Sequence, residues 1–226
     1  MITIKIIFMK KYFLFSTMLF IAGTVWAQTD TKYPEPEFSK EVYYLKKDST
    51  NIAVRLEKGS SKMESKAKMG GFGGSESAYP IEGEKSTIRL SPVNKLSFVF
   101  SNGASAKTSN PQADSMMAAS GMDPSMMQDM MSGMNDPAST ITLYKVEIEK
   151  GKRKILLQKN PGAMPFGSKK QKSSDKYTFS VKKIRNGYWE LVIDKTLPRG
   201  EYAFILSGMG MSNMDGSITI FAFAVD

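Results

Sequence analysis

The sequence predicts an all-β fold, an antiparallel two-sheet sandwich of the immunoglobulin-like or jelly-roll-like kind. Three observations predict it. Ten segments after residue 40 are rich in β-branched and aromatic residues. Short polar turns such as "RNG" (185 to 187) join several of them, and helix signals are confined to one insertion, 102–139.

The first 27 residues have the pattern of a secretory signal peptide. Lys10 and Lys11 precede an apolar run that is too short to span a membrane, and the run ends in small residues before Gln28. Translation starts at Met1 or at Met9. Cleavage would remove three lysines and no acid, so the formal net charge falls from +9 to +6. We expect a periplasmic or secreted protein with no transmembrane segment after cleavage.

Residues 28–40 are polar, contain two prolines and predict a flexible lead-in to a single domain, 41–226. The first two strands, 41–47 and 51–57, flank the turn "DST" and form a hairpin. Residues 58–85 are of low complexity and predict a flexible loop, because "GGFGG" lacks the Lys-Ser/Thr end of a phosphate-binding loop. The remaining strands are predicted at 86–90, 95–101, 140–150, 153–159, 176–184, 188–194, 201–207 and 217–226.

The insertion 102–139 is rich in methionine: eight of the 17 methionines lie between Met116 and Met134. Asn110 and Asp123 can each cap a short helix whose first residue is proline, and a glycine follows each predicted helix. At about 100° per residue, the methionines of the second helix form one face. The candidate thioether residues are Met122, Met126, Met127, Met130, Met131 and Met134.

This methionine-rich face has three interpretations. It closes one end of the sandwich as a lid; it is a pliable surface for an apolar protein or envelope partner; or its thioethers bind Cu(I) or Ag(I). Three further methionines lie in 207–216. If each later strand reverses direction, the two methionine-rich segments lie at opposite ends of the sandwich, and any metal site is confined to residues 116–134.

The composition excludes most catalytic chemistry. The chain has no histidine and no cysteine, so it has no imidazole base, no thiol nucleophile and no disulfide. Ser-x-x-Lys occurs at Ser65/Lys68, Ser173/Lys176 and Ser180/Lys183, but none of these lysines is placed where burial would depress its pKa. We therefore expect a protein without enzymatic activity and without a catalytic site.

The positive charge is concentrated in runs such as "GKRK" (151 to 154) and "SKKQKSSDK" (168 to 176). Aromatic residues do not alternate with these lysines, as they do in nucleic-acid-binding surfaces. The runs predict solvated loops and strand ends, with attraction to an anionic envelope surface as the alternative.

The C-terminal half contains "GYWELVIDKTLPRGEYAF" (187 to 204). With "GEKSTIRL" (83 to 90) and "ITLYKVEIEKGKRKIL" (141 to 156), it resembles a loose group of exported bacterial proteins that share an L-x-x-G-E-Y-A-F run and have no assigned activity. Independently of this resemblance, Pro198 and Gly200 predict a turn into a strand, with the Tyr202 hydroxyl tied to nearby backbone. Glu201 has a structural interpretation and, as the alternative, a binding role.

Overall fold

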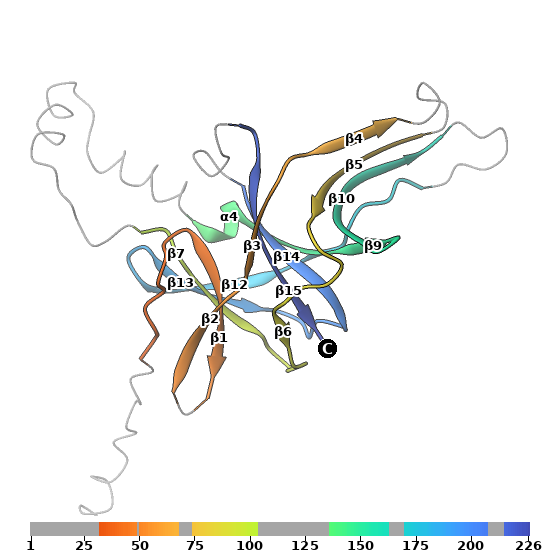
Figure 1. Cartoon of the computed structure of the whole chain (residues 1–226). Helices are drawn as coiled ribbons and strands as arrows, with labels where there is room; N and C mark the ends of the chain where they lie inside the picture. The colour runs from red at the N-terminus through yellow and green to blue at the C-terminus, as the bar shows by residue number, and fades with distance from the viewer. Residues whose placement is uncertain (1–31, 49, 68–73, 104–135, 163–169, 208–214) are drawn as a thin grey trace, which may run out of the picture. The chain divides into compact units, whose positions relative to one another are not determined.

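The computed structural model describes residues 32–48, 50–67, 74–103, 136–162, 170–207 and 215–226 (Figure 1). The chain divides into two compact units, Met1–Tyr33 and Pro34–Asp226, and the fold below is that of the second. Its strands are β1 (Glu41–Lys47), β2 (Asn51–Arg55), β3 (Glu57–Ser61), β4 (Glu64–Ala67), β5 (Gly74–Ile81), β6 (Arg89–Leu90), β7 (Ser97–Ser101), β8 (Ile141–Lys145), β9 (Glu147–Glu149), β10 (Lys152–Pro161), β11 (Lys176–Tyr177), β12 (Phe179–Arg185), β13 (Tyr188–Ile193), β14 (Gly200–Leu206) and β15 (Ile218–Val225). One short helix, α4 (Pro137–Thr140), is described.

The strands form three sheets, which we name A, B and C. Sheet A has the order β12-β13-β7-β1-β2, and sheet B has the order β11-β8-β14-β15-β3, with β6 pairing alongside β15. Sheet C has the order β4-β5-β10-β9. All pairings except that of β6 with β15 are antiparallel. The all-β, antiparallel prediction is therefore confirmed.

Sheets A and B enclose the main hydrophobic core. Phe98 of β7 lies 4.9 Å from Phe204 of β14 and 5.0 Å from Phe223 of β15, measured between ring centroids. All three side chains are fully buried. Buried aromatic side chains contribute large apolar areas, and edge-to-face pairs such as Phe98 and Phe204 add specific geometry. This core makes sheets A and B the two layers of a β-sandwich.

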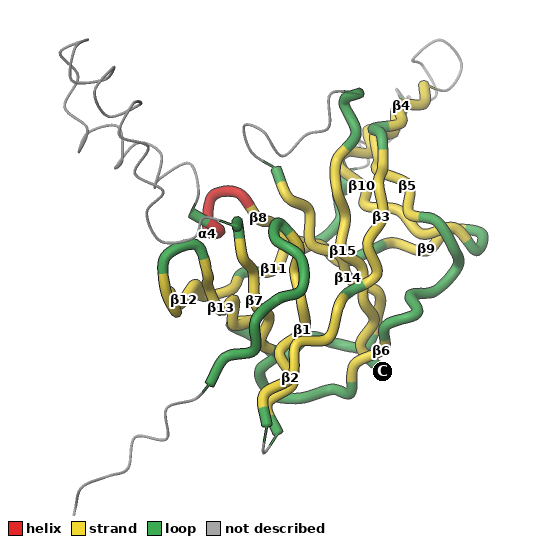
Figure 2. Tube along the Cα trace, turned by 60° about the vertical axis from the view of Figure 1, so that its left-hand side comes forward, coloured by secondary structure: helices red, strands yellow, loops and turns green. Residues whose placement is uncertain are grey.

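Sheet C covers the opposite face of sheet B and adds a third layer (Figure 2). Tyr202 and Phe204 point into the core shared with sheet A, whereas Ala203 and Ile205 point into a second core that contains Ile155 of β10. The side chains of β14 thus alternate between the two cores. Both faces of β14 are covered, so apolar residues are favoured at consecutive positions and not only at every second one. The sequence predicts only two sheets, and the third comes from segments with weak strand patterns.

The described parts of the predicted flexible loop, 58–67 and 74–85, are largely strands. They contain the end of β3 and all of β4 and β5. The strand β4 is exposed at every residue, and β5 is rich in serine, so their side chains give no apolar alternation. Backbone pairing holds them instead: β3 pairs with β15, and β5 pairs with both β4 and β10. Strands of this kind cannot be recognised from alternating apolar and polar residues in the sequence.

The lead-in also differs from its prediction as a flexible segment, because residues 34–38 contact sheet A. The Phe38 amide donates a hydrogen bond of 3.0 Å to the Tyr43 hydroxyl. Arg185 forms an ion pair with Glu35, and the Tyr188 hydroxyl donates to the Pro34 carbonyl. These contacts join the lead-in to strands that follow it by up to 154 residues, which local composition does not indicate.

The described residues that follow the first methionine-rich segment and precede the second lie at the same end of sheet B, whereas the prediction put the two segments at opposite ends. The Ser207 amide donates a hydrogen bond of 2.7 Å to the Thr140 carbonyl, and Ile141 lies opposite Leu206 in the β8–β14 register. The predicted strand 140–150 leaves sheet B at Val146, and its second half, β9, pairs with β10 in sheet C. The chain therefore does not reverse once per strand within a single sandwich.

The predicted methionine-rich helices lie in residues 104–135, outside the described residues. At the end of the insertion, Asp136 caps α4: its carboxylate accepts a hydrogen bond of 2.9 Å from the Ala138 amide, and Pro137 occupies the first turn. In the described part of the chain, no helix is long and apolar enough to cross a membrane.

Candidate functional site

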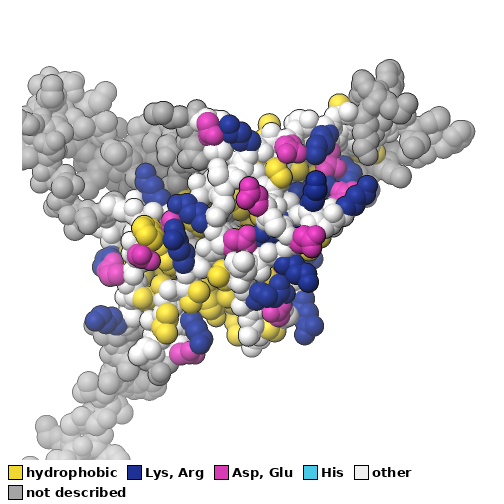
Figure 3. All heavy atoms as spheres, in the orientation of Figure 1, with side chains coloured by type: hydrophobic (Ala, Val, Ile, Leu, Met, Phe, Trp, Pro, Cys, Tyr) yellow, Lys and Arg dark blue, Asp and Glu magenta, His cyan; other side chains and the backbone are white. Residues whose placement is uncertain are grey.

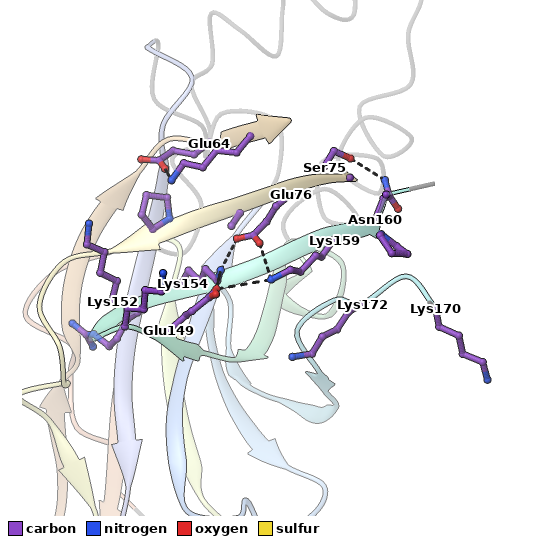
Figure 4. A pocket seen from close by; sticks show the side chains of 18 residues that line it. Glu64, Ser75, Glu76, Glu149, Lys152, Lys154, Lys159, Asn160, Lys170 and Lys172 are labelled. Atoms are coloured by element: carbon purple, nitrogen blue, oxygen red, sulfur yellow. Dashed lines mark hydrogen bonds and ion pairs between the residues drawn. The ribbon is translucent and has the colours of Figure 1, made fainter. Parts of the chain in front are cut away.

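A hollow of about 850 Å³ lies on the face of sheet C that points away from sheet B. Its floor is formed by β5 and β10, its sides by β4 and β9, and residues 170–172 run along β10 (Figure 4). In Figure 3, basic and acidic side chains stand close together over this part of the molecule. The hollow is a concave feature of the described residues on which a ligand site can be built.

Strand alternation and one bulge determine which side chains face the hollow. In β10, Lys152 and Lys154 point outward, whereas Arg153 and Ile155 point toward sheet B. Lys159 is an odd number of residues from Lys154, so a regular strand would place it on the other face. A register shift between Leu156 and Gln158 returns Lys159 to the hollow.

The hollow is strongly basic. Of its described lining residues, eight are lysine or arginine and three are glutamate; one of the eight, Arg153, points toward sheet B. Five of the basic residues have carboxylate partners, whereas Lys150, Lys152 and Lys170 form no ion pair with another described residue. Among the described residues of the chain, the lining contains no aromatic side chain. An excess of ammonium groups without a stacking surface favours a compact anionic group over a nucleobase.

Glu76 organises the centre of the hollow (Figure 4). Its carboxylate lies 2.5 Å from the Lys154 ammonium and 3.0 Å from the Lys159 ammonium. Glu149 of the edge strand β9 contacts the same two lysines, at 2.5 Å and 3.9 Å. The hydrogen bond from Lys154 is the main cause that lowers the pKa of both carboxyls. Both glutamates are therefore ionised at neutral pH.

Lys154 is not suited to act as a nucleophile or a base. Burial alone would lower the pKa of Lys154, but hydrogen bonds to Glu149 and Glu76 outweigh it and raise the pKa. A lysine nucleophile needs a depressed pKa. The arrangement holds positive charge in place and can bind anions, but it does not generate a reactive amine.

Arg153 lies behind the hollow and joins sheets B and C. It is only 1% exposed, and its guanidinium contacts the carboxylates of Glu57 and Glu201 and the carbonyls of Glu82 and Gly83. Burial alone would raise the pKa of Glu57, but hydrogen bonds, foremost from Arg153, lower it. Arg153 is thus a buried ion-pair residue and not part of a solvated charge run as predicted. Arg153 is two residues from Ile155 and therefore lies on the same face of the strand. This spacing is the sequence signal that indicates its burial.

Glu201 belongs to the same network. It is 6% exposed, accepts a hydrogen bond of 2.9 Å from the Ser86 amide, and lies 3.5 Å from the Arg89 guanidinium. The next residue, Tyr202, donates its hydroxyl hydrogen to the Pro198 carbonyl at 2.6 Å, as predicted for the turn into this strand. These contacts favour the structural interpretation of Glu201.

The other residues singled out in the sequence are placed as follows. The six methionines from Met122 to Met134 lie outside the described residues. The Ser180 hydroxyl donates to Asp194 at 2.6 Å, and the Ser65 hydroxyl is 3.0 Å from that of Ser77. Within the described ranges, no three acidic side chains are grouped so that they could hold a metal ion.

No family model, no curated protein and no solved structure matches this chain. The resemblance to exported bacterial proteins stays a prediction. The hollow therefore has to be interpreted from its own geometry and charge.

Proposed function

We propose that this chain is an exported, non-enzymatic binding protein of the cell envelope that holds an anionic ligand in the hollow on sheet C. The observation that supports the proposal is the excess of lysine over glutamate among the described lining residues, seven against three, in a concave surface. A concave surface with walls of low dielectric constant concentrates the electric field of its charges and so attracts an oppositely charged ligand.

A binding role fits the chemistry of the hollow better than catalysis. The ammonium group of Lys154 is saturated by carboxylates and has a raised pKa. Lysine ammonium groups act as point charges toward phosphate and carboxylate groups, and no proton transfer is needed for binding. Three lysines, Lys150, Lys152 and Lys170, have no ion-pair partner among the described residues, and they supply the attraction.

Neutralising these three lysines together, as Lys150→Gln, Lys152→Gln and Lys170→Gln, is expected to weaken binding of dextran sulfate about tenfold or more. A tenfold loss corresponds to about 1.4 kcal/mol, less than about 0.5 kcal/mol for each charge. Isothermal titration calorimetry at fixed salt measures the change.

The matched control is Lys85→Gln, Lys95→Gln and Lys195→Gln, which removes the same charge from three exposed positions outside the hollow. The control is expected to retain most of the affinity. An equal loss in both triple variants would show that only net charge matters, and the proposed site would be wrong.

Cu(I) or Ag(I) binding by the methionine-rich segments is a second candidate function. The hydrogen bond between Ser207 and Thr140 supports it, because it joins the strand ends from which the two segments continue in the sequence. Met209, Met211 and Met214 are therefore candidate ligands together with the methionines of residues 116–134. Thioether ligands select Cu(I) and tolerate an oxidising compartment better than thiols do.

Anaerobic titration with Cu(I) tests this candidate. Changing Met126, Met127, Met130 and Met131 to leucine is expected to abolish binding, because leucine keeps the apolar volume and removes the sulfur. A parallel variant changes Met209, Met211 and Met214 to leucine and tests whether both segments contribute. Binding no tighter than that of a weak competing chelator, or binding unchanged in both variants, would exclude the metal function.

A further inference from the structure

We infer that the hollow takes an acidic peptide segment, and that Glu149 occupies the place on Lys154 and Lys159 that a carboxylate of that segment takes on binding. This inference rests on the proposed function of the hollow and names its ligand class. It follows from the different positions of the two glutamates that contact this lysine pair.

Glu76 is built into the sheet. It belongs to β5, which has a paired strand on each side, and its side chain is 23% exposed. Its two carboxylate oxygens contact different lysines, Lys154 through one and Lys159 through the other. Glu76 therefore positions both ammonium groups, whether or not a ligand is present.

Glu149, in contrast, lies where it can be displaced. It is the last residue of the edge strand β9, directly before the turn at Lys150 and Gly151, and its side chain is 51% exposed. One of its oxygens serves both lysines, at 2.5 Å from Lys154 and 3.9 Å from Lys159. An exposed ion pair is worth little net free energy, because water solvates the separated groups well. A ligand carboxylate can therefore replace it at small cost.

The group that Glu149 places on Lys154 is a carboxylate, and this indicates that the ligand group that replaces it is a carboxylate as well. Lys154 is 14% exposed and carries a charge that two carboxylates satisfy. A second carboxylate in the place of Glu149 keeps this charge balance, whereas an apolar or cationic ligand would leave the ammonium unpaired. The pair of lysines is thus organised for a carboxylate.

The spacing of the lysines favours an extended peptide as the carrier. Lys152 and Lys154 are two residues apart on one face of β10, and Lys170 and Lys172 have the same separation along the neighbouring segment. Side chains two residues apart in an extended chain repeat at about 6.6 Å. An acidic peptide in extended conformation presents its carboxylates with that same repeat. The described lining residues offer no aromatic ring on which a sugar or a base would stack.

Hexaglutamate is the probe for this inference, with binding measured by calorimetry at fixed salt. Glu149→Gln is expected to bind it about fivefold to tenfold more tightly, because the internal competitor is gone. The matched control is Glu64→Gln. It removes the same charge from the same hollow, but Glu64 pairs with Lys66 and not with Lys154 or Lys159. An equal gain in both variants would mean that net charge, and not displacement, determines binding, and would overturn the inference.

A double-mutant comparison tests whether the gain in affinity from Glu149→Gln depends on Lys154. In a Lys154→Gln background, the gain from Glu149→Gln is expected to vanish, because the lysine that both carboxylates share is absent. Retention of the full gain would overturn the inference. If Lys154→Gln lowers the melting temperature too far for titration, Lys159→Gln takes its place, since Lys159 contacts the same two glutamates.

Failure of the inference and failure of the proposed function give different results. If the hollow lysines matter for dextran sulfate but Glu149→Gln behaves like Glu64→Gln, only the displacement at Glu149 is wrong. If the hollow lysines do not matter either, the proposed function fails as well. Tighter binding of a hexagalacturonate than of hexaglutamate would assign the hollow to an acidic polysaccharide and overturn the peptide assignment.

Discussion

Replacing Arg153 with methionine is expected to lower the free energy of unfolding by about 3–5 kcal/mol, the range for breaking a buried ion pair by removing one partner. The guanidinium is 1% exposed, and its loss leaves the 6% exposed carboxylate of Glu201 without the cation that lies 3.4 Å away. The carbonyls of Glu82 and Gly83 lose their donor as well. Urea denaturation followed by circular dichroism measures the change.

Two further variants make the Arg153 result specific. Arg199→Met removes an exposed arginine on the turn before β14 and is expected to change the unfolding free energy by less than about 0.5 kcal/mol. Combining Arg153→Met with Glu201→Gln is expected to recover part of the loss, because the buried charge is removed together with its partner. A loss of less than about 1 kcal/mol for Arg153→Met would contradict the buried network.

Truncating Phe98 to alanine is expected to cost about 3–5 kcal/mol of unfolding free energy, as large-to-small changes of buried aromatic residues do. Phe98 is fully buried and touches the rings of Tyr44, Phe204 and Phe223, so its removal opens a cavity between sheets A and B. The measurement is the same urea titration, with the slope of the transition checked for two-state behaviour.

Phe38→Ala is the matched control for Phe98. The Phe38 ring is 43% exposed, and its main described contact is the Arg55 guanidinium, 4.6 Å from the ring centroid. An exposed cation–π contact is worth about 0.5–1 kcal/mol, so the control should cost no more than that. Similar losses for the two variants would mean that sheets A and B do not share the core described for them.

Local patterns in the sequence predict the sandwich well. The hairpins of β1 with β2 and of β12 with β13 form between neighbouring segments, so their turns and apolar alternation are sufficient to identify them. The hydrogen bond from Tyr202 to the Pro198 carbonyl spans four residues and is likewise a local feature. Elements that depend on nearby residues are the ones that a single sequence specifies most directly.

Sheet C and its hollow could not be predicted, because they depend on distant pairings. Glu76 and Lys154, which meet at the centre of the hollow, are 78 residues apart in the chain. The bulge between Leu156 and Gln158 turns Lys159 toward the hollow. The order of apolar and polar residues does not indicate this bulge. Because the chain leaves sheet B at Val146, the strand count fails, and Thr140 and Ser207, which lie beside the two methionine-rich segments in the sequence, are hydrogen-bonded to each other.

The central strand β14 makes sheet C depend on the sandwich. Ala203 and Ile205 support the sheet that carries the hollow, while Tyr202 and Phe204, on the same backbone, support the core shared with sheet A. If the core between sheets A and B unfolds, sheet C loses the strand on which it packs. If sheet C unfolds, sheets A and B keep their own core. Amide hydrogen exchange should accordingly be faster in β4 and β5 than in β14 and β15, so that the hollow can open without the sandwich unfolding.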